Sequence, residues 1–442
     1  MRNYKLNKKF IIVCWMTMLC FTLSSCNVKN SDSDNENETT KVNKEDVFTE
    51  RDLEQNVDLS ESDSITVKDG ENINITKEGI YEITGSAKNA TVFVEAGDDD
   101  KVQLVLNNLS IENESAPVIY VKNADKVFVT STDTESDLKV SGELKSDGDT
   151  NVDGVIFSKD DIVMNGTGTI NITSSDNAIS SKDELKITGG TLNINCTKSA
   201  IEANEGIYMA DGTINVETCN DGLHAEDNDD DSLGSIYIAG GTLMIKANDD
   251  CIHATTTVTI DDGKMELTGS ECIEGTYIVV NGGDINITSS DDGINASAKS
   301  KKYTPAFELN GGNVVITMGA GDTDGVDSNG DIYINGGTIS ITGQSTFDYD
   351  GNAEYKGGTI IENGTQTNQI SNQMFGRGGG QKGMNRPEGN SDFDGNMGQR
   401  PEGEFKPEKR FNKDEDLNSN EGFVPKQELD PNNSEINEDK QI

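Results

Sequence analysis

The chain has 442 residues, of which only 33% are hydrophobic, and its 79 acidic residues against 36 basic ones give a net charge of -43. Such an acidic protein is a poor partner for nucleic acid and for anionic membrane surfaces, because both recruit Lys and Arg. The charge favours cations instead, and polymers that reach the protein through cations. The low apolar content is natural for thin repeated units that each bury one stripe.

The N-terminus has the pattern of an export signal. Basic residues between Arg2 and Lys9 precede an apolar run from Phe10 to Leu23, and Ser24, Ser25 and Cys26 follow. A charged start, an apolar stretch of this length and small residues before a cleavage point predict a secretory signal. The ending resembles a bacterial lipobox, which predicts that 1–26 is a lipoprotein signal peptide and that Cys26 is lipidated. An ordinary signal peptide with an incidental Cys is the alternative.

These features predict a secreted protein that is anchored by lipid to the outer face of a bacterial cell membrane. Residues 27–60 are polar and are expected to form a disordered tether. Residues 61–144 hold strand-like runs without a tight repeat, which predicts irregular first coils. Residues 361–442 are acidic and rich in Gly, Asn and Gln, which predicts a disordered tail. Residues 61–360 are then one folded domain.

Between Thr169 and Gly358 a unit of about 22 residues recurs. The first two copies, TINITSSDNAISSKDELKITGG and TLNINCTKSAIEANEGIYMADG, align without a gap. Each copy alternates apolar residues, crosses a short polar turn and closes on Gly-Gly or Asp-Gly. A fixed period without a helical pattern predicts an all-β fold, a right-handed parallel β-helix in which one repeat makes one coil. We expect it to be a monomer.

Aligned repeats give columns of equivalent positions. The first inward column pairs are Ile170/Ile172, Leu192/Ile194, Ile214/Val216, Leu243/Ile245, Met265/Leu267, Ile285/Ile287, Val314/Ile316 and Ile339/Ile341. The second is Ile179, Ile201, Leu223, Ile252, Ile273, Ile294 and Val326. Paired glycines are expected to make corners with positive φ. Extra residues fall on one edge, around 227–235, 297–305 and 328–330, and such loops usually border the working face.

The turn between the strands carries two outward columns of oxygen ligands. One column is Asn177, Ser199, Asp221, Asp250, Glu271, Asp292 and Asp324, and the other is Ser180, Glu202, His224, His253, Glu274, Asn295 and Asp327. Coils stack about 4.8 Å apart, where two carboxylates repel by roughly 1–3 kcal/mol. Calcium would relieve this repulsion, since it is bound by six to eight oxygens. The calcium candidates are Asp221, Asp250, Glu271, Asp292, Asp324 and Asp327. The alternative is that Asp and Asn are turn formers on an acidic surface.

Two further pairs sit in neighbouring coils. His224 and His253 share one column, where they could ligate a transition metal, contact a sugar hydroxyl or be ordinary exposed turn residues. Tyr208 and Tyr237 share an outward strand column. Aromatic faces hold sugar rings, so this pair is a candidate sugar platform, although solvent-facing Tyr is also a common strand residue.

The cysteines also follow the repeat. Cys251 and Cys272 occupy equivalent turn positions in neighbouring coils, where the spacing lies within disulfide range. A buried reduced pair is the alternative, and a nucleophile is disfavoured because no base is paired with either. The cysteines after Cys26 show no CxxC spacing, which argues against a cysteine zinc site.

Several runs resemble a known family, among them IYVKNADKVFVT, DGLHAEDN, DDCIHA, ECIEG, DDGINA, DGVDSNGDIYINGGTISITG and FDYDG. Over about residues 61–360 the chain resembles the bacterial carbohydrate-binding-domain family of cell-surface β-helix proteins. That family is described as binding cellulose and acidic sugars, and as similar in fold and calcium sites to pectate lyases. By resemblance, Asp324, Asp327, Asp348 and Asp350 are calcium candidates. This chain differs from the family in three respects: Cys251 and Cys272 replace the usual Gly, the tail replaces a last β segment, and no Trp follows the leader, which argues against flat crystalline cellulose.

These observations predict a non-catalytic binding module. Calcium held by the acidic turns would bridge to the carboxylates of a uronic-acid polymer, with cellulose as another possible ligand. A pectate-lyase-like enzyme is the first alternative, but β-elimination needs a base beside the metal. No Arg lies between Asp52 and Gly376, and Lys198 in the turns is flanked by Ser199 rather than by carboxylates. A passive surface stalk or adhesin is the second alternative.

Overall fold

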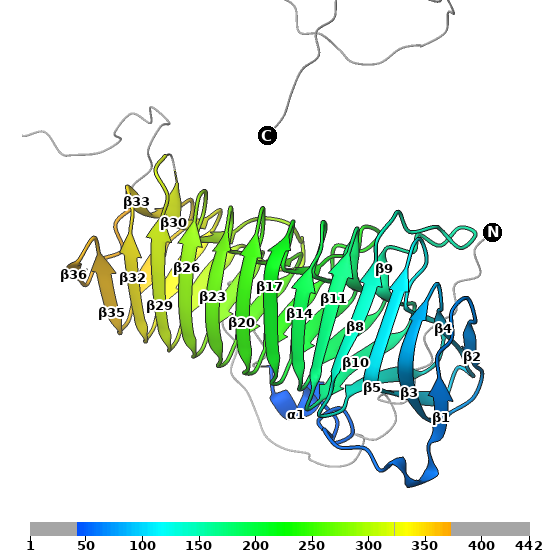
Figure 1. Cartoon of the computed structure of the whole chain (residues 1–442). Coiled ribbons are helices and arrows are strands. Elements are labelled where there is room, and N and C mark those ends of the chain that lie inside the picture. The colour runs from blue at the N-terminus through cyan, green and yellow to red at the C-terminus, as the bar shows by residue number, and fades with distance from the viewer. Residues whose placement is uncertain (1–41, 322, 373–442) are drawn as a thin grey trace, which may run out of the picture. The chain divides into compact units, whose positions relative to one another are not determined.

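The computed structural model describes residues 42–321 and 323–372, where almost every element is a strand. The predicted signal peptide, Cys26 and most of the predicted tail lie outside the described residues. The strands run in long parallel ladders (Figure 1). Within the described part, no helix is long and apolar enough to cross a membrane.

Each coil of the chain contributes strands in turn to a first, a second and a third ladder. One coil consists of β11 (Thr169–Ser174), β12 (Asn177–Ser181) and β13 (Glu184–Ile187), and β14 (Thr191–Asn195) opens the next coil by pairing in parallel with β11. Neighbours in a ladder therefore belong to successive coils, which is the arrangement of a β-solenoid. The expected parallel stacking is confirmed, and the right-handed coiling stays a prediction.

The ladders extend through the described residues. The first ladder consists of β1 (Asp63–Thr66), β3 (Gly79–Lys88), β5 (Lys101–Asn113), β8 (Glu135–Val140), β11, β14, β17 (Thr213–Cys219), β20 (Thr242–Ala247), β23 (Lys264–Gly269), β26 (Asp284–Ser289), β29 (Asn313–Met318), β32 (Thr338–Thr342) and β35 (Thr359–Glu362). The second consists of β2 (Ile73–Ile75), β4 (Val92–Glu95), β6 (Ile119–Asn123), β9 (Gly154–Ser158), β12, β15 (Ile201–Ala203), β18 (Leu223–Ala225), β21 (Ile252–Ala254), β24 (Ile273–Gly275), β27 (Ile294–Ala296), β30 (Asp324–Ser328) and β33 (Ser345–Tyr349). The third consists of β7 (Lys126–Ser131), β10 (Asp161–Gly166), β13, β16 (Gly206–Met209), β19 (Ser235–Ile238), β22 (Thr257–Ile260), β25 (Tyr277–Val280), β28 (Ala306–Leu309), β31 (Asp331–Ile334) and β34 (Ala353–Tyr355). Because β5 is long enough to pair with both β7 and β8, the first and third ladders join into one sheet.

The core is a stack of apolar columns. The register pairs Ile170 with Leu192 and Leu192 with Ile214, as the repeat predicts. All members of both predicted inward columns are buried. Each such side chain stabilises the fold by roughly 1.5–3 kcal/mol, and the core continues from coil to coil without a break.

The paired glycines make tight corners at the end of the third ladder. Gly312, the second glycine of its pair, has φ +79°, which side chains disfavour. A Cβ on Gly311, the first glycine, would collide with the backbone oxygen of Asn281 in the preceding coil. The first glycine thus allows close stacking and the second allows the turn.

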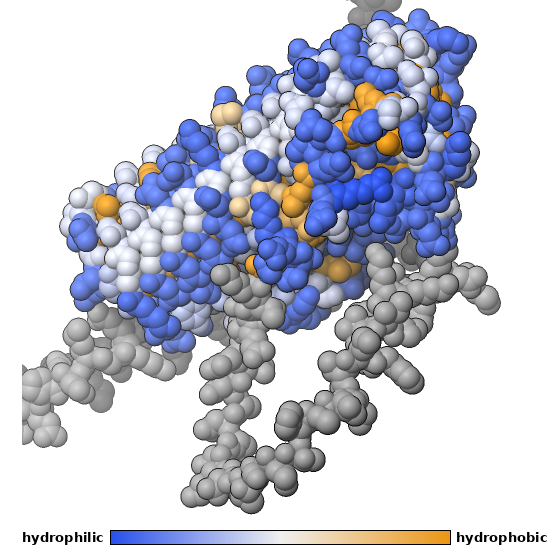
Figure 2. Space-filling model, turned by 90° about the horizontal axis from the view of Figure 1, so that it is seen from below, coloured by the Kyte–Doolittle hydropathy of each residue, from blue (hydrophilic) through white to orange (hydrophobic). Residues whose placement is uncertain are grey.

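The prediction of a disordered tether is wrong for residues 42–60. This segment contains α1 (Lys44–Val47) and a 3₁₀ turn at Leu59–Glu61, and α1 lies beneath the strands in Figure 1. Phe48 is buried and packs 6.4 Å, ring centroid to ring centroid, from Tyr237. Seen from below, this side of the unit is mostly hydrophilic, with apolar colour confined to a few patches (Figure 2). The segment thus makes an apolar contact through Phe48, which its mostly polar composition did not indicate.

Polar contacts fix the same segment to the third ladder. Asp52 is fully buried, accepts a hydrogen bond from the Thr49 backbone N–H (2.9 Å) and lies 3.3 Å from Lys126 Nζ. Burial opposes its ionisation, but these partners outweigh that effect and lower the pKa of Asp52. Gln55 accepts from Gly166 N (2.8 Å) and donates to Thr188 O (3.0 Å).

The predicted start of the disordered tail is also wrong. β35 ends at Glu362, and β36 (Thr365–Thr367) folds back antiparallel onto it. Asn372 then forms a bridge with Phe347. Ordered structure therefore continues at least through residue 372. The sequence did not indicate this, because the hairpin caps the last coil and does not follow the repeat.

Replacing Ile245 with Ala should lower the unfolding free energy by about 2–5 kcal/mol, because Ile245 is buried in the inward column. Met244 precedes it on β20 and is 43% exposed, so Met244→Ala is the matched control and should change stability by about 0.5 kcal/mol or less. Urea denaturation monitored by circular dichroism measures both. Equal losses would contradict the assigned inward register.

Candidate functional site

The outward face of the second ladder carries the predicted polar column. The register places Glu202 beside His224, His224 beside His253 and His253 beside Glu274. Further along, Asn295 pairs with Asp327, and Asp327 with Asp348. The second predicted column is thus confirmed, and Asp348 extends it by one coil.

His253 is held between two carboxylates. Its Nδ1 lies 2.7 Å from Asp250 Oδ2 and 2.9 Å from Glu274 Oε2, and all three residues are buried. Burial opposes a charge on the ring, but the two hydrogen bonds outweigh it and raise the pKa of His253 to about 10. The expectation of an ordinary exposed turn residue is wrong for His253, which forms a buried ionic cluster.

Glu274 is the centre of this cluster. Besides His253, its carboxylate accepts from Lys299 Nζ at 3.0 Å and from Ser297 Oγ at 2.9 Å. Burial opposes its ionisation, but the hydrogen bonds from His253 and Lys299 lower the pKa of Glu274 to about 2. Sequence analysis missed Lys299, because it belongs to the 297–305 insertion and not to the repeat.

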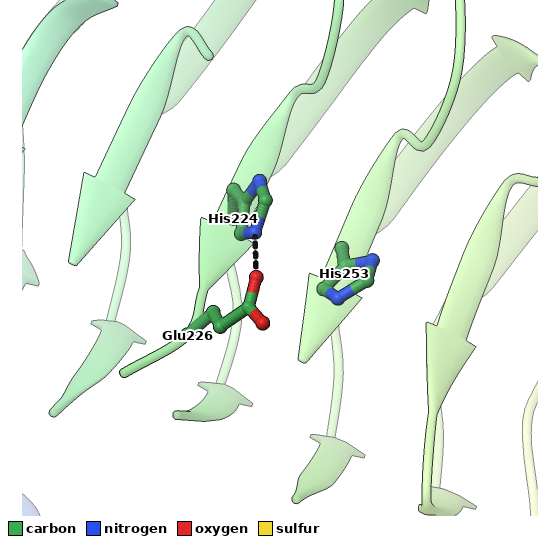
Figure 3. A group of neighbouring side chains, drawn as sticks. All are labelled: His224, Glu226 and His253. Atoms are coloured by element: carbon green, nitrogen blue, oxygen red, sulfur yellow. Dashed lines mark hydrogen bonds and ion pairs between the residues drawn. The ribbon is translucent and has the colours of Figure 1, made fainter. Parts of the chain in front are cut away.

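His224 forms a second group with Glu226. The Nε2 of His224 lies 3.1 Å from Glu226 Oε2 (Figure 3). Its Nδ1 lies 3.4 Å from Asp221 Oδ2. One ring nitrogen of each His and one carboxylate oxygen of Glu226 lie within 4.8 Å of one another. Sequence analysis missed Glu226, although it follows His224 by two residues at the start of the 227–235 insertion.

The last coils carry a different, all-acidic group. Asp292 begins it, and Asp324, Asp327, Asp348 and Asp350 follow. Burial, with the charges of Asp327, Asp291 and Asp324, raises the pKa of Asp292 to about 7. Burial, with Asp348, Asp324 and Asp350, raises the pKa of Asp327 to about 6. Among the described residues, neither Asp292 nor Asp327 forms an ion pair with Lys, Arg or His.

The calcium candidates therefore divide into two groups. Asp221 and Asp250 face His224 and His253, so contacts with imidazole rings already compensate part of their charge. Glu271 accepts from Asn295 Nδ2 at 2.8 Å, and burial together with Glu274 and Asp250 raises its pKa. The acidic group of the last coils is called the terminal aspartate cluster from here on. Within it, neighbouring carboxylates raise the pKa values of Asp292 and Asp327, and a calcium ion would relieve this repulsion.

Two insertions meet beside the histidines. A cavity of about 460 Å³ is lined by Glu226, by the loop 227–231, and by Thr255, Lys299 and Lys301. Lys301 Nζ lies 3.2 Å from Asp231 Oδ2, which links the 297–305 loop to the 227–235 loop. Two of the three predicted insertions thus line one polar cavity.

A groove of about 730 Å³ lies on the outward face of the first ladder. Its floor is an amide ladder in which Asn193 donates to Asn171 (2.9 Å) and Asn215 donates to Asn193 (2.8 Å). The Oδ1 of Asn215 is buried without a hydrogen-bond partner among the described residues. Met244 follows in the same column and is largely exposed, and Lys246 also lines the groove. The recurrence of Asn at one repeat position was the available sequence signal for this surface.

The tyrosine pair is not an exposed platform. Tyr208 and Tyr237 are register partners, as predicted, but Tyr237 is only 2% exposed. Phe48 packs against it, and its hydroxyl donates to Asp261 Oδ2 at 2.7 Å. The N-terminal segment covers this face, so neither tyrosine presents an open ring to a sugar.

The cysteines are buried thiols. Cys251 Sγ and Cys272 Sγ lie 3.8 Å apart, both fully buried and not joined by a disulfide. This is the reduced pair, one of the two predicted alternatives. Burial raises the pKa of a thiol and so disfavours the reactive thiolate. It raises the pKa of Cys196 to about 12, so no reactive role follows.

The fold and the polar columns define a β-solenoid, and a comparison with known proteins shows its family. The chain belongs to the family of carbohydrate-binding domain-containing proteins, whose profile matches residues 69–325. A carbohydrate-binding domain-containing protein of Acetivibrio thermocellus is 27% identical over 185 residues, which are 41% of this chain and 63% of that protein. The chain thus spans less than two thirds of the length of this relative.

One solved structure is also similar, that of the polysaccharide lyase-like protein from C. thermocellum in a gadolinium derivative. It is 25% identical with a TM-score of 0.43, and the similarity covers 51% of this chain and 93% of that one. The matched family region contains both histidines and ends before Asp327, Asp348 and Asp350.

Replacing Glu274 with Gln should lower the unfolding free energy by about 3–5 kcal/mol, because His253 and Lys299 would lose a buried counter-charge. Glu271→Gln, three residues earlier, is the control. It should be neutral or stabilising, because it removes a carboxylate that is repelled by Glu274 and Asp250. Thermal denaturation at pH 7 in chelator compares them, and an equal loss from both would refute this view of the cluster.

Proposed function

We propose that the protein binds polysaccharide without cleaving it, and that calcium held by the terminal aspartate cluster bridges to the carboxylates of a uronic-acid polymer. Membership of the carbohydrate-binding family supports the polysaccharide as ligand. The observation that carries the calcium is a group of half-buried aspartates in the last coils, of which Asp292 and Asp327 have raised pKa values.

The energetics support a cation at this cluster. Asp327 and Asp348 are register partners in adjacent strands, and carboxylates at that spacing repel by roughly 1–3 kcal/mol. A calcium ion with two carboxylate ligands replaces this repulsion by attraction and still has coordination positions for a sugar carboxylate. The net charge of -43 would otherwise repel an acidic polymer.

The groove on the first ladder supplies the neutral contacts in this proposal. Amide donors and acceptors suit sugar hydroxyls, and the exposed Met244 offers an apolar surface to a ring face. Lys246 offers a cation for a uronate carboxylate. The first-ladder strands from β11 to β29 lead into the turns that carry the predicted polar column, so a polymer lying along the coils could contact both.

A lyase is the weaker candidate because Lys299, a lysine of the acidic face, is poorly suited to proton abstraction. Burial would lower the pKa of Lys299, but its hydrogen bond to Glu274 and the surrounding carboxylates raise it instead. A general base must be unprotonated at the operating pH. Lys299 is therefore held as a cation that stabilises the cluster.

We retain lipid anchoring through Cys26 as part of the proposal, supported by the sequence of the leader. Metabolic labelling with a radioactive fatty acid in the native host tests it. Label in the wild type that disappears in Cys26→Ala would support the anchor, and equal label in both would exclude it.

Titration of the purified protein with oligogalacturonate should give binding in calcium and none in chelator. Asp327→Asn should weaken the calcium-dependent affinity about tenfold, or about 1.4 kcal/mol. Asp99→Asn, an exposed carboxylate in an early coil, is the control and should bind like the wild type. Binding that persists unchanged in chelator would contradict the bridge. Release of unsaturated uronates during the titration would contradict the non-catalytic role.

The groove makes a separate prediction. Met244→Ala and Lys246→Met should each weaken oligogalacturonate binding roughly three- to tenfold, about 0.7–1.4 kcal/mol, because they remove a ring contact and a counter-charge. Calcium binding without sugar should stay unchanged, since neither residue belongs to the terminal aspartate cluster. Calorimetry with calcium alone and then with sugar separates these effects. Unchanged sugar affinity in both variants would place the polymer elsewhere.

A further inference from the structure

The chain contains only two histidines, and they meet. His224 and His253 pair in register in the adjacent strands β18 and β21, with their ring centroids 4.6 Å apart. Glu226 reaches the same place from the residue that follows β18 (Figure 3). Two nitrogen donors and one carboxylate thus converge in a column that otherwise carries oxygen ligands.

A second set of carboxylates orients both rings. The residue three positions before each His is an Asp, and Asp221 and Asp250 each face the Nδ1 of their own histidine, at 3.4 and 2.7 Å. Glu274 adds a second acceptor to Nδ1 of His253, at 2.9 Å. These contacts leave Nε2 of each ring for a ligand. In metal sites, a ligating His commonly donates its other N–H to a carboxylate in this way.

We propose that His224 Nε2, His253 Nε2 and Glu226 bind a divalent transition-metal ion of the zinc type. Imidazole and carboxylate together suit zinc, whereas calcium takes oxygen ligands. Binding replaces the proton on each Nε2 with the metal, and the protons leave to solvent. The surrounding carboxylates, Asp221, Asp250 and Glu274, then compensate the charge of the ion.

The distances fit this chemistry. A tetrahedral zinc ion with bonds of about 2.0–2.1 Å separates its donors by about 3.3 Å, and His224 Nε2 lies 3.1 Å from Glu226 Oε2. One ring nitrogen of each histidine and one carboxylate oxygen of Glu226 lie within 4.8 Å of one another. Small side-chain rotations would bring His253 to the ion, because its neighbours fix only Nδ1.

The fourth coordination position would face the cavity between the two insertions. Glu226 lines this cavity of about 460 Å³, together with Lys299 and Lys301. Three protein ligands leave one position open to water or to a solute. This site is separate from the terminal aspartate cluster, so it does not rest on the proposed function.

Calorimetric titration of the purified, chelator-treated full-length chain with zinc chloride, in excess calcium, tests the proposal. The wild type should bind one zinc ion per chain. Glu226→Gln and His224→Gln should each weaken zinc binding at least about tenfold, and Asp250→Asn about 10- to 100-fold. Glu202→Gln, in the same column one coil away, and Asp327→Asn are the controls and should bind zinc like the wild type. Circular dichroism verifies that each variant is folded.

Cobalt provides a second readout that a purely structural role would not produce. Substitution of Co²⁺ for zinc should give the intense visible absorption of a four-coordinate nitrogen and oxygen site, and Glu226→Gln should abolish it. Absence of zinc binding by the wild type would overturn the proposal. Binding that is equal in the wild type, Glu226→Gln and His224→Gln would overturn it too, because it would show adsorption to acidic groups.

Discussion

The parallel register between coils is the constraint on which the rest of the structure depends. It places each repeat position over its equivalent in the next coil, about 4.8 Å away, so a residue type that recurs in the repeat is stacked on its own kind. An apolar position becomes a continuous core, and an asparagine position becomes the amide ladder from Asn171 to Asn215. An acidic position becomes a line of repelling charges. The same rule that stabilises the inside therefore creates the chemistry on the outside.

The chain resolves this repulsion differently along one column. Around His253 the carboxylates of Asp250 and Glu274 face a cationic ring, and Lys299 arrives from an insertion. Around Asp327 the register supplies another carboxylate, Asp348. A single column thus offers mixed nitrogen and oxygen donors in its middle coils and oxygen donors alone at its end. Ion preference in such a fold can change within a few coils without any change in the backbone.

Periodic features could be predicted from the sequence and non-periodic ones could not. The inward columns and the alignment of His224 with His253 follow from the repeat, because equivalent positions of successive repeats pair in register. Lys299 and Glu226 lie in or beside insertions, whose paths the period does not specify. Tyr237 was expected to be exposed because its strand position faces outward. Its burial depends on Phe48, which lies far away in the sequence and in no repeat.

The N-terminal segment determines how the solenoid would carry mechanical load. From β1 it runs back along the third ladder, where Gln55 contacts Gly166 and Thr188, and Lys44 Nζ donates to Ala210 O at 3.2 Å. A pull on residue 42 therefore acts first on contacts in the middle coils, across several strands at once. Contacts that bear a force together, in shear, resist it better than the hydrogen bonds of a terminal coil, which a pull would break one after another. The N-terminal segment would thus keep such a force away from the first coil, which has only one neighbouring coil to hold it.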